Sequence, residues 1–272
     1  MGSAGFPRGN AIVRLVMDVQ EAAERWSLTL GEPYTQGAAG FTVRAETDDG
    51  TPVVLKLVHP HRESEHEADA LEVWDGNGAV RLLDRDETGN VLLLERCEPG
   101  TPLSSLNQDA ALDIVIELLP RLWVGAGQPF HTLAEEAAWW ASYLPTRWRG
   151  ERHLLGAALD AIATLSQTQG EQVLLHQDLH GGNVLAAERE PWLVIDPKPL
   201  VGEREFGVAH IVRSFQPESK RDVLHRFDRL TAELSLDRER ARGWAIAQAV
   251  AWTEGPYAAR NVLAASSLLE DA

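Results

Sequence analysis

One segment decides the fold that we expect: Leu175-His176-Gln177-Asp178-Leu179-His180-Gly181-Gly182-Asn183-Val184-Leu185. It has the spacing H-x-D-x-x-x-x-N, and a second acid, Asp196, ends the apolar run that follows it. Asp178 stands where it can take a proton from a hydroxyl, while Asn183 and Asp196 supply the hard oxygen ligands that Mg²⁺ prefers. These groups form the smallest set that a phosphoryl transfer from ATP requires.

The same spacing is typical of the catalytic loop of protein kinases, in which an arginine stands at the position of Gln177. A lone aspartate before two glycines would be interpreted as a helix N-cap or a turn residue. The complete pattern, followed by an apolar strand that ends in an acid, outweighs that interpretation. We therefore predict Asp178 as the catalytic base, Asn183 and Asp196 as metal ligands, and ATP and Mg²⁺ as cofactors.

The composition is that of a folded, acidic protein. The chain has 272 residues and 44% hydrophobic content, enough for one large domain or two smaller lobes. Its formal net charge of −16 opposes nucleic acid and anionic membranes as partners and is compatible with a cationic small-molecule acceptor. Cys97 is the only cysteine, so no intrachain disulfide can form. Because neither a signal pattern nor a bilayer-spanning apolar run is present, we expect a cytoplasmic protein.

Strand patterns dominate the first part of the chain, and helical patterns dominate the rest. In the first part we expect strands at 41–46, 52–58, 79–83 and 91–95 and helices at 18–30 and 63–74. After Pro99-Gly100 we expect short strands at 184–185 and 192–195 and helices at 107–123, 133–144, 152–168, 218–235, 237–254 and 256–269. This order indicates a bilobal α+β protein, with an N-lobe at 1–96, a C-lobe at 97–272 and a cleft where they join.

Lys56 and Glu67 are the predicted nucleotide-binding pair. Lys56 lies in an otherwise apolar strand, and Glu67 lies in the helix that follows. Taken alone, Lys56 is equally an edge-strand charge, and Glu67 is one of several acids on that helix. The order of strand lysine, helix glutamate, catalytic aspartate, asparagine and metal aspartate favours the phosphate-binding role for Lys56, with Glu67 holding it in place.

Backbone groups complete the predicted nucleotide site. The amides around Gly37 and Gly40 can cover phosphates, although a simple turn explains these glycines as well. At the lobe joint, the Glu95 carbonyl and the Cys97 N–H can meet the edge of the adenine ring.

Acceptor residues are harder to predict. Candidates from the residue types are His180, Trp139, Trp140 and Glu136, together with Lys198. Core packing for the tryptophans and a solvated helix face for Glu136 are the alternatives. A zinc pair of His176 and His180 is rejected because the two glycines that follow would break a helix. We also expect no metal at the remaining histidines of the polar loop and helix start, His59, His61 and His66.

These motifs together resemble the aminoglycoside/hydroxyurea antibiotic resistance kinases, the group that contains streptomycin 6-phosphotransferases. Besides the catalytic loop, the matching segments are Lys56, Glu65–Leu71, Trp74-Asp75-Gly76, Gly78–Leu83, Leu93–Arg96 and Ile195–Pro199. The resemblance extends from about residue 30 to residue 255. It implies a protein-kinase-like fold, ATP and Mg²⁺, and a phosphotransferase with a small alcohol as acceptor, for which an aminoglycoside such as streptomycin is the first candidate.

Two departures from the family pattern affect the expected acceptor. Gln177 replaces a glycine beside the base and can reshape the pocket. Gly207 stands where the family has an aspartate that braces the catalytic loop. The alternatives are therefore a kinase of hydroxyurea, an amino sugar or another metabolite, or a catalytically weak binding protein.

Overall fold

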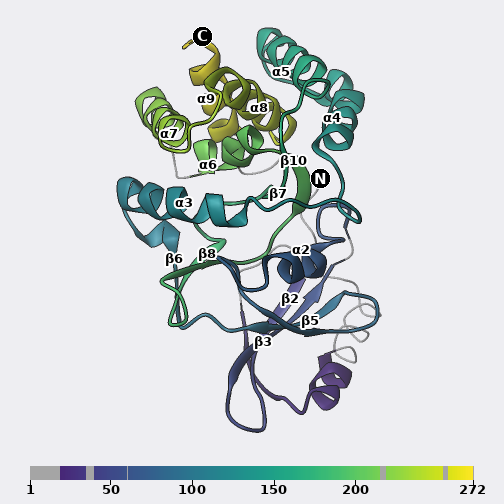
Figure 1. The fold of residues 1–272 in the computed structure, drawn as a ribbon. Coiled ribbons are helices and arrows are strands. Elements are labelled where there is room, and N and C mark those ends of the chain that lie inside the picture. The colour runs from purple at the N-terminus through teal and green to yellow at the C-terminus, as the bar shows by residue number, and fades with distance from the viewer. Residues whose placement is uncertain (1–18, 35–39, 60, 215–218, 254–256, 272) are drawn as a thin grey trace.

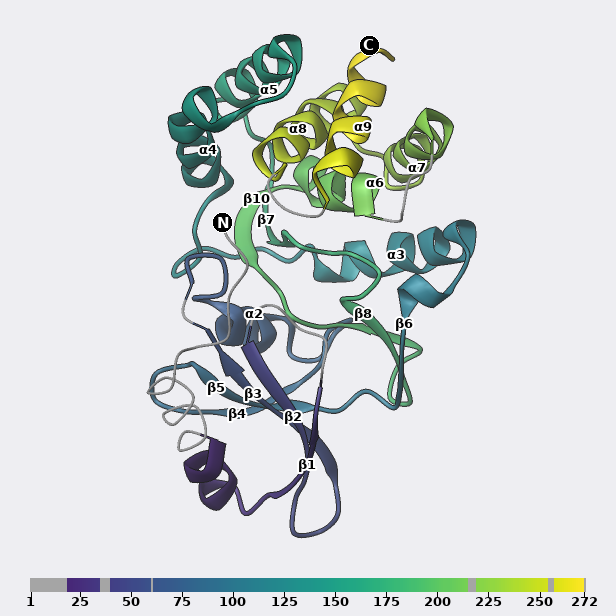
Figure 2. The same ribbon diagram turned by 180° about the vertical axis from the view of Figure 1, so that it is seen from behind.

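The N-terminal part is built on a twisted antiparallel sheet. The computed structural model describes residues 19–34, 40–59, 61–214, 219–253 and 257–271. Five strands pair in the order β1-β2-β3-β5-β4, and Figures 1 and 2 show them below the helices of the rest of the chain. Their bounds are β1 Thr29–Pro33, β2 Gly40–Glu46, β3 Pro52–Val58, β4 Leu82–Arg85 and β5 Val91–Glu95. Burial alternates along the second half of β2, as on an edge-side strand with one face covered, whereas the last four residues of the more central β3 are all buried.

Helix α2 (Glu67–Trp74) joins this sheet to the C-terminal part. Its buried face, which includes Leu71 and Trp74, belongs to the same apolar core as α3 (Gln108–Leu122). The Trp74 indole N–H donates to the Leu122 carbonyl at 2.9 Å. The helix ends at Asp75, which adopts a left-handed conformation with φ 45°. Packing and hydrogen bonding thus fix α2 against both parts.

Two small sheets hold the segments that carry the predicted chemistry. One has the order β6-β8-β9, from Pro99–Pro102, Val184–Ala187 and Trp192–Val194. The other pairs β7 (Gln172–His176) with β10 (Pro199–Glu203). Residues 177–183 connect β7 to β8, and residues 195–198 connect β9 to β10, so both connections leave from neighbouring strand ends.

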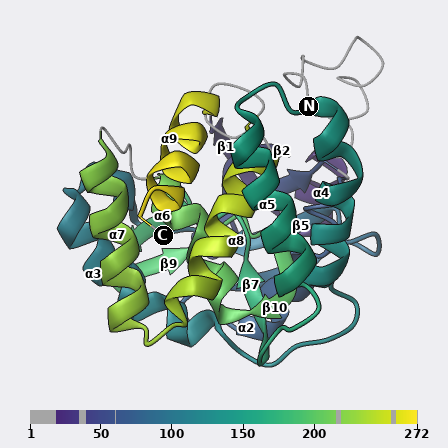
Figure 3. The same cartoon turned by 90° about the horizontal axis from the view of Figure 1, so that it is seen from above.

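Helices make up most of the remaining chain. They are η1 (Leu103–Ser105), α4 (Leu133–Arg147), α5 (Arg152–Leu165), η2 (Arg204–Val208), α6 (Ala209–Ser214), α7 (Lys220–Glu233), α8 (Arg238–Ala251) and α9 (Ala258–Leu269). Figure 3 shows α8 between α5 and α9. Helix α8 is buried on nearly all sides, with Ala241, Ala245 and Ala249 among the residues that let its neighbours approach closely. No described helix is long and apolar enough to cross a membrane.

The predicted fold class is confirmed, and several predicted boundaries are wrong. The first helix ends at residue 25 rather than 30, because the chain turns at Ser27 with φ 51° and β1 begins two residues later. Gly31 therefore lies inside β1. Ala79 and Val80 do not belong to β4; the Val80 N–H donates to the Val194 carbonyl of β9 at 3.0 Å. The boundary between residues 96 and 97 stays a prediction and falls between β5 and β6.

The sequence patterns also missed short elements. Strands β6, β7 and β10 and helix α6 are each six residues or shorter, too short for periodicity to separate them from loops. They were not predicted, yet β7, β10 and α6 all border the catalytic loop.

Candidate functional site

The candidate catalytic loop is held at both ends by strands. Leu179 N–H and Asn183 N–H donate to the carbonyls of His176 and His180, at 3.2 and 2.8 Å, which curls the loop back on itself. Asn183 also donates its side-chain N–H to the Asp178 carbonyl at 3.0 Å, and its own carbonyl accepts from Ile195 N–H at 2.9 Å. The loop therefore brings Asp178, Asn183 and the segment before Asp196 together, as the sequence predicts.

The two carboxylate oxygens of Asp178 have different neighbours. Its Oδ2 lies 2.7 Å from Lys198 Nζ, and its Oδ1 lies 3.3 Å from His210 Nδ1. Burial disfavours a charged lysine at this depth, but Asp178 and Glu63 outweigh burial and raise the pKa of Lys198. The ion pair fixes Oδ2 beside a permanent positive charge.

The contact of Oδ1 with His210 is not an ion pair. Burial and the nearby Arg213 lower the pKa of His210 well below its ordinary value, so this imidazole is neutral. Arg213 Nη2 lies 3.0 Å from His210 Nδ1, and an arginine only donates, so Nδ1 accepts and the proton sits on Nε2. Two acceptors then face each other, and no described residue donates to Oδ1. This oxygen is open to a hydroxyl proton.

Lys56 lies between two carboxylates. Its Nζ is 2.5 Å from Glu67 Oε1 and 2.5 Å from Asp196 Oδ1. Burial alone would lower the pKa of Lys56, but Glu67 and Asp196 outweigh it and raise the pKa. For Glu67, burial raises the pKa of the carboxyl group, and the attraction of Lys56 only partly offsets this rise. For Asp196, burial is outweighed by Lys56 and Lys198, and its pKa is lowered. The predicted order of lysine, helix glutamate and second aspartate is therefore one contact chain.

The donor set beside Lys56 fits a hard divalent cation. The side-chain N–H of Asn183 donates to the Asp178 carbonyl, so the amide oxygen of Asn183 faces away from that bond. Asp196 uses Oδ1 for Lys56, and no described residue bonds to its Oδ2. Two oxygen donors, one of them anionic, match the ligand preference of Mg²⁺. Asp196 is held with φ 56°, a left-handed conformation that is uncommon for a non-glycine residue.

The other predicted nucleotide residues are placed differently. Gly37 lies outside the described residues. Gly40 begins β2 so close to β3 that a Cβ would lie 2.2 Å from the Leu57 carbonyl oxygen, which explains the glycine by packing alone. The Glu95 side chain is bound by Arg189 at 2.8 and 2.9 Å. The Cys97 N–H makes no hydrogen bond to another described residue, and burial raises the pKa of its thiol to about 12.

The candidate acceptor residues divide into two groups. His180 and Lys198 lie beside Asp178: the His180 ring is 5.8 Å from that of His210, and Lys198 Nζ is 5.3 Å above the Trp252 ring. Trp140, by contrast, is fully buried in the core and donates to Glu136 Oε1 at 2.9 Å. The structure thus contradicts an acceptor role for Trp140, because no surface of it reaches solvent.

The Glu136 carboxylate is also bound by other residues of the protein. It is buried, and its second oxygen forms an ion pair with Arg62. Its charge is therefore already neutralised, and the prediction that it meets an acceptor directly is wrong. Trp139 remains partly exposed, with the Arg62 guanidinium 5.0 Å above its ring, so its role stays a prediction.

Sequence reasoning missed the residues that support the loop from α6 and α8. Gln248 donates to the Gln177 carbonyl at 3.2 Å and accepts from Arg213 at 3.3 Å. Arg213, with its pKa lowered to about 10 by burial, still carries a charge at neutral pH. At Gly207 a Cβ would lie 2.9 Å from the Trp123 indole nitrogen. Trp123 thus fills the space of the expected aspartate, and Gln248 supplies the brace instead.

The fold and this contact chain define the class of protein. The structure superimposes on a choline kinase from Streptococcus pneumoniae with a TM-score of 0.69, covering 94% of this chain and 99% of that one at 13% identity. The shared feature is the protein-kinase-like fold, with a β-rich first part and a helical second part.

Sequence comparison gives the family. Residues 25–255 match the model of the aminoglycoside/hydroxyurea antibiotic resistance kinases. A hydroxyurea phosphotransferase from Kitasatospora aureofaciens is 42% identical over 85% of this chain and 70% of its own length. A streptomycin 6-kinase from Streptomyces glaucescens is 39% identical over 83% of this chain and 78% of its own. The chain belongs to this family of ATP-dependent small-molecule kinases.

Proposed function

We propose that this protein transfers the γ-phosphoryl group of ATP to a hydroxyl of a small antibiotic-like compound, with streptomycin as the first candidate. The observation that carries the proposal is the open Oδ1 of Asp178, next to the chain of Lys56, Glu67 and Asp196. In this reading Oδ1 accepts the proton of the acceptor hydroxyl as the oxygen attacks phosphorus. Lys198 orients the same carboxylate through Oδ2.

Nucleotide binding is assigned to the groups around Lys56. Lys56 binds phosphate oxygens while Glu67 holds its ammonium group in place. Asn183 and Asp196 hold Mg²⁺, which when bound neutralises the charge of the transferring phosphate oxygens. The Glu95 carbonyl and the unbonded Cys97 N–H are the proposed partners of the adenine edge. With residues 1–96 and 97–272 as the two lobes, this places the nucleotide in the cleft between them.

Hydroxyurea is a second candidate acceptor, and one observation favours it. The groups around Asp178 include two cations, Lys198 and Arg213, and each further acid among the described residues already lies beside a lysine: Glu63 is 3.8 Å from Lys198 Nζ, and Asp196 is 2.5 Å from Lys56 Nζ. Such a lining suits a small neutral acceptor better than a polycation. The 42% identity to a hydroxyurea phosphotransferase points the same way.

A radiolabel transfer assay distinguishes the two. Purified protein is incubated with γ-labelled ATP, Mg²⁺ and either streptomycin, hydroxyurea or a neutral amino sugar derivative. Transfer to one of the first two identifies the acceptor class. If the label moves to none of these while ATP still binds, the protein is not a kinase of this acceptor class.

A further inference from the structure

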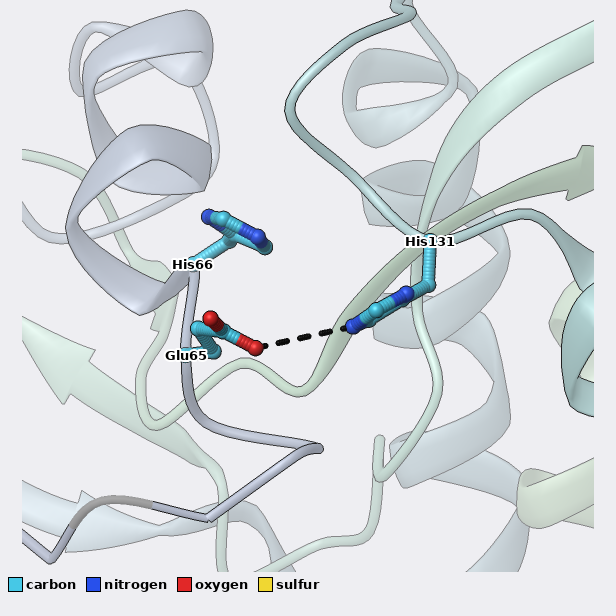
Figure 4. Close-up of side chains that lie close together, drawn as sticks. All are labelled: Glu65, His66 and His131. Atoms are coloured by element: carbon cyan, nitrogen blue, oxygen red, sulfur yellow. Dashed lines mark ion pairs between the residues drawn. The ribbon is translucent and has the colours of Figure 1, made fainter.

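A cluster of nitrogen and oxygen ligands lies outside the candidate catalytic site. Glu65 and His66 immediately precede and cap α2, and His131 precedes α4. Figure 4 shows their side chains converging from these two segments. One ligand atom from each lies within 4.8 Å of the other two, and His131 Nε2 is 3.6 Å from Glu65 Oε2. The two segments lie 65 residues apart in sequence (131 − 66), so helical spacing alone does not bring these side chains together.

The His66 ring is oriented by a carboxylate. Its Nδ1 lies 2.9 Å from Asp69 Oδ2, and Asp69 is in turn held by Arg85 Nη1 at 2.7 Å. A carboxylate held by Arg85 in this way accepts from Nδ1–H, which leaves His66 Nε2 with a free lone pair. This pairing of histidine and carboxylate is the usual support of a metal-binding imidazole.

A second, independent observation that points to a bound metal ion concerns His131. Its Nε2 is buried and has no hydrogen-bond partner among the described residues. Its backbone is fixed, because its carbonyl accepts from Val201 N–H of β10 at 2.8 Å. A buried polar atom without a partner costs about 1–3 kcal/mol in general, and a bound cation would satisfy it.

We propose that Glu65, His66 and His131 bind a Zn²⁺-class ion that links α2 to the C-terminal part. Two imidazoles and a carboxylate suit zinc or nickel rather than Mg²⁺, and water completes a tetrahedral shell. Metal–ligand bonds of about 2.0–2.1 Å place neighbouring ligand atoms about 3.3 Å apart. The 3.6 Å contact of His131 with Glu65 is already close to that value, and a ligand atom of His66 lies within 4.8 Å of both.

The position of the cluster gives the ion a consequence for the nucleotide site. Helix α2 begins at Glu67, the partner of Lys56, directly after His66. On the other side, His131 is hydrogen-bonded to β10, which pairs with the strand that leads into the catalytic loop. An ion at this point therefore ties the helix that holds Lys56 to the strands that hold Asp178. The site is independent of which acceptor the enzyme uses.

Cobalt absorption tests the site without reference to activity. Untagged full-length protein is titrated with Co²⁺ in the absence of nucleotide, and visible d–d bands report binding, which Zn²⁺ should then displace. We expect His131→Ala to bind Co²⁺ at least 10-fold more weakly and Asp69→Asn to lose about 10- to 100-fold in affinity, as removal of a supporting carboxylate does elsewhere. His153→Ala, an exposed histidine on α5, is the matched control and should bind normally.

The same experiment can overturn the proposal. Equal Co²⁺ affinity in the wild type and in His131→Ala would show that the cluster holds no metal, and so would an absence of d–d bands in the wild type. Circular dichroism of each variant checks its fold. If His131→Ala does not fold, Glu65→Gln decides instead, because Glu65 is exposed and its replacement leaves the core untouched. Unchanged Co²⁺ affinity in Glu65→Gln would then overturn the proposal.

Discussion

At the scale of single residues, the neutral tautomer of His210 decides which oxygen of Asp178 can act. Arg213 donates to His210 Nδ1 and thereby removes the only hydrogen that could have reached Oδ1. Lys198 occupies Oδ2 at 2.7 Å. One oxygen is thus anchored and the other is left without a donor, which is the arrangement that a positioned base requires.

Asp178→Asn is the direct test of the base. The amide cannot accept the acceptor proton, and loss of a general base typically lowers the rate by about 10² to 10⁴. Nucleotide affinity should stay nearly constant, because Asp178 touches none of the proposed phosphate ligands. Single-turnover transfer rates and a separate ATP-binding titration measure the two quantities. Turnover close to that of the wild type would remove Asp178 from this role.

The two proposed metal ligands should contribute unequally to Mg²⁺-dependent nucleotide binding. Asp196→Ala removes an anionic oxygen and one of the two carboxylates that hold Lys56, so Mg²⁺-dependent nucleotide binding should be lost. Asn183→Ala removes a neutral oxygen that water can replace, and its effect should be milder. Nucleotide affinity measured at a series of Mg²⁺ concentrations shows which of the two replacements weakens binding more. A larger loss for Asn183→Ala would reverse the assignment.

At the scale of elements, β10 is tied to α8 through the buried Glu203. Its carboxylate accepts from Arg240 at 2.8 and 2.9 Å, from Gly170 N–H at 3.1 Å and from the Trp244 indole. Trp244 is itself fully buried. The single carboxylate therefore joins the strand beside the catalytic loop to the central helix, and Gln248 on the same helix reaches the Gln177 carbonyl.

Glu203→Ala should therefore destabilise the whole protein. It leaves the Trp244 N–H and a half-buried Arg240 without their acceptor, and breaking such a buried pair costs about 3–5 kcal/mol. We expect a loss of about 3 kcal/mol, since Arg240 can turn toward water. Urea denaturation followed by tryptophan fluorescence measures the free energy of unfolding. Glu188→Ala between β8 and β9 is the control, since its side chain is exposed, and it should change stability by less than about 0.5 kcal/mol. A similar effect of both replacements would argue against the buried network.

At the scale of the whole molecule, the net charge of −16 separates the two acceptor candidates. A polycation such as streptomycin is attracted by an acidic protein, and salt screens that attraction over a Debye length of about 8 Å at physiological ionic strength. The KM for a cationic acceptor should therefore rise clearly between low and high salt, while the KM for hydroxyurea should barely move. Steady-state kinetics in a KCl series provide the measurement. A flat KM for streptomycin would mean that the lining around Lys198 and Arg213 governs binding, rather than the overall charge.

The fold class and the order of the phosphoryl-transfer groups could be predicted from the amino-acid sequence alone. The spacing from Asp178 to Asn183 and the apolar run before Asp196 depend only on local geometry, because strands β8 and β9 form a short hairpin that brings both ends together. Lys56 and Glu67 were predictable for the same reason, since a strand followed directly by a helix places them at adjoining positions.

The surroundings of these groups became known only from the packing of distant elements in the structure. His210 and Gln248 reach the loop from α6 and α8, and no local pattern records that contact. Trp140 and Glu136 looked like acceptor residues, but burial commits them to the core and to Arg62. The sequence grouped His66 with His59 and His61, whereas the fold sets His131 beside it. Local spacing is encoded along the chain, whereas such contacts depend on how whole elements pack, and a single sequence contains no direct measure of that packing.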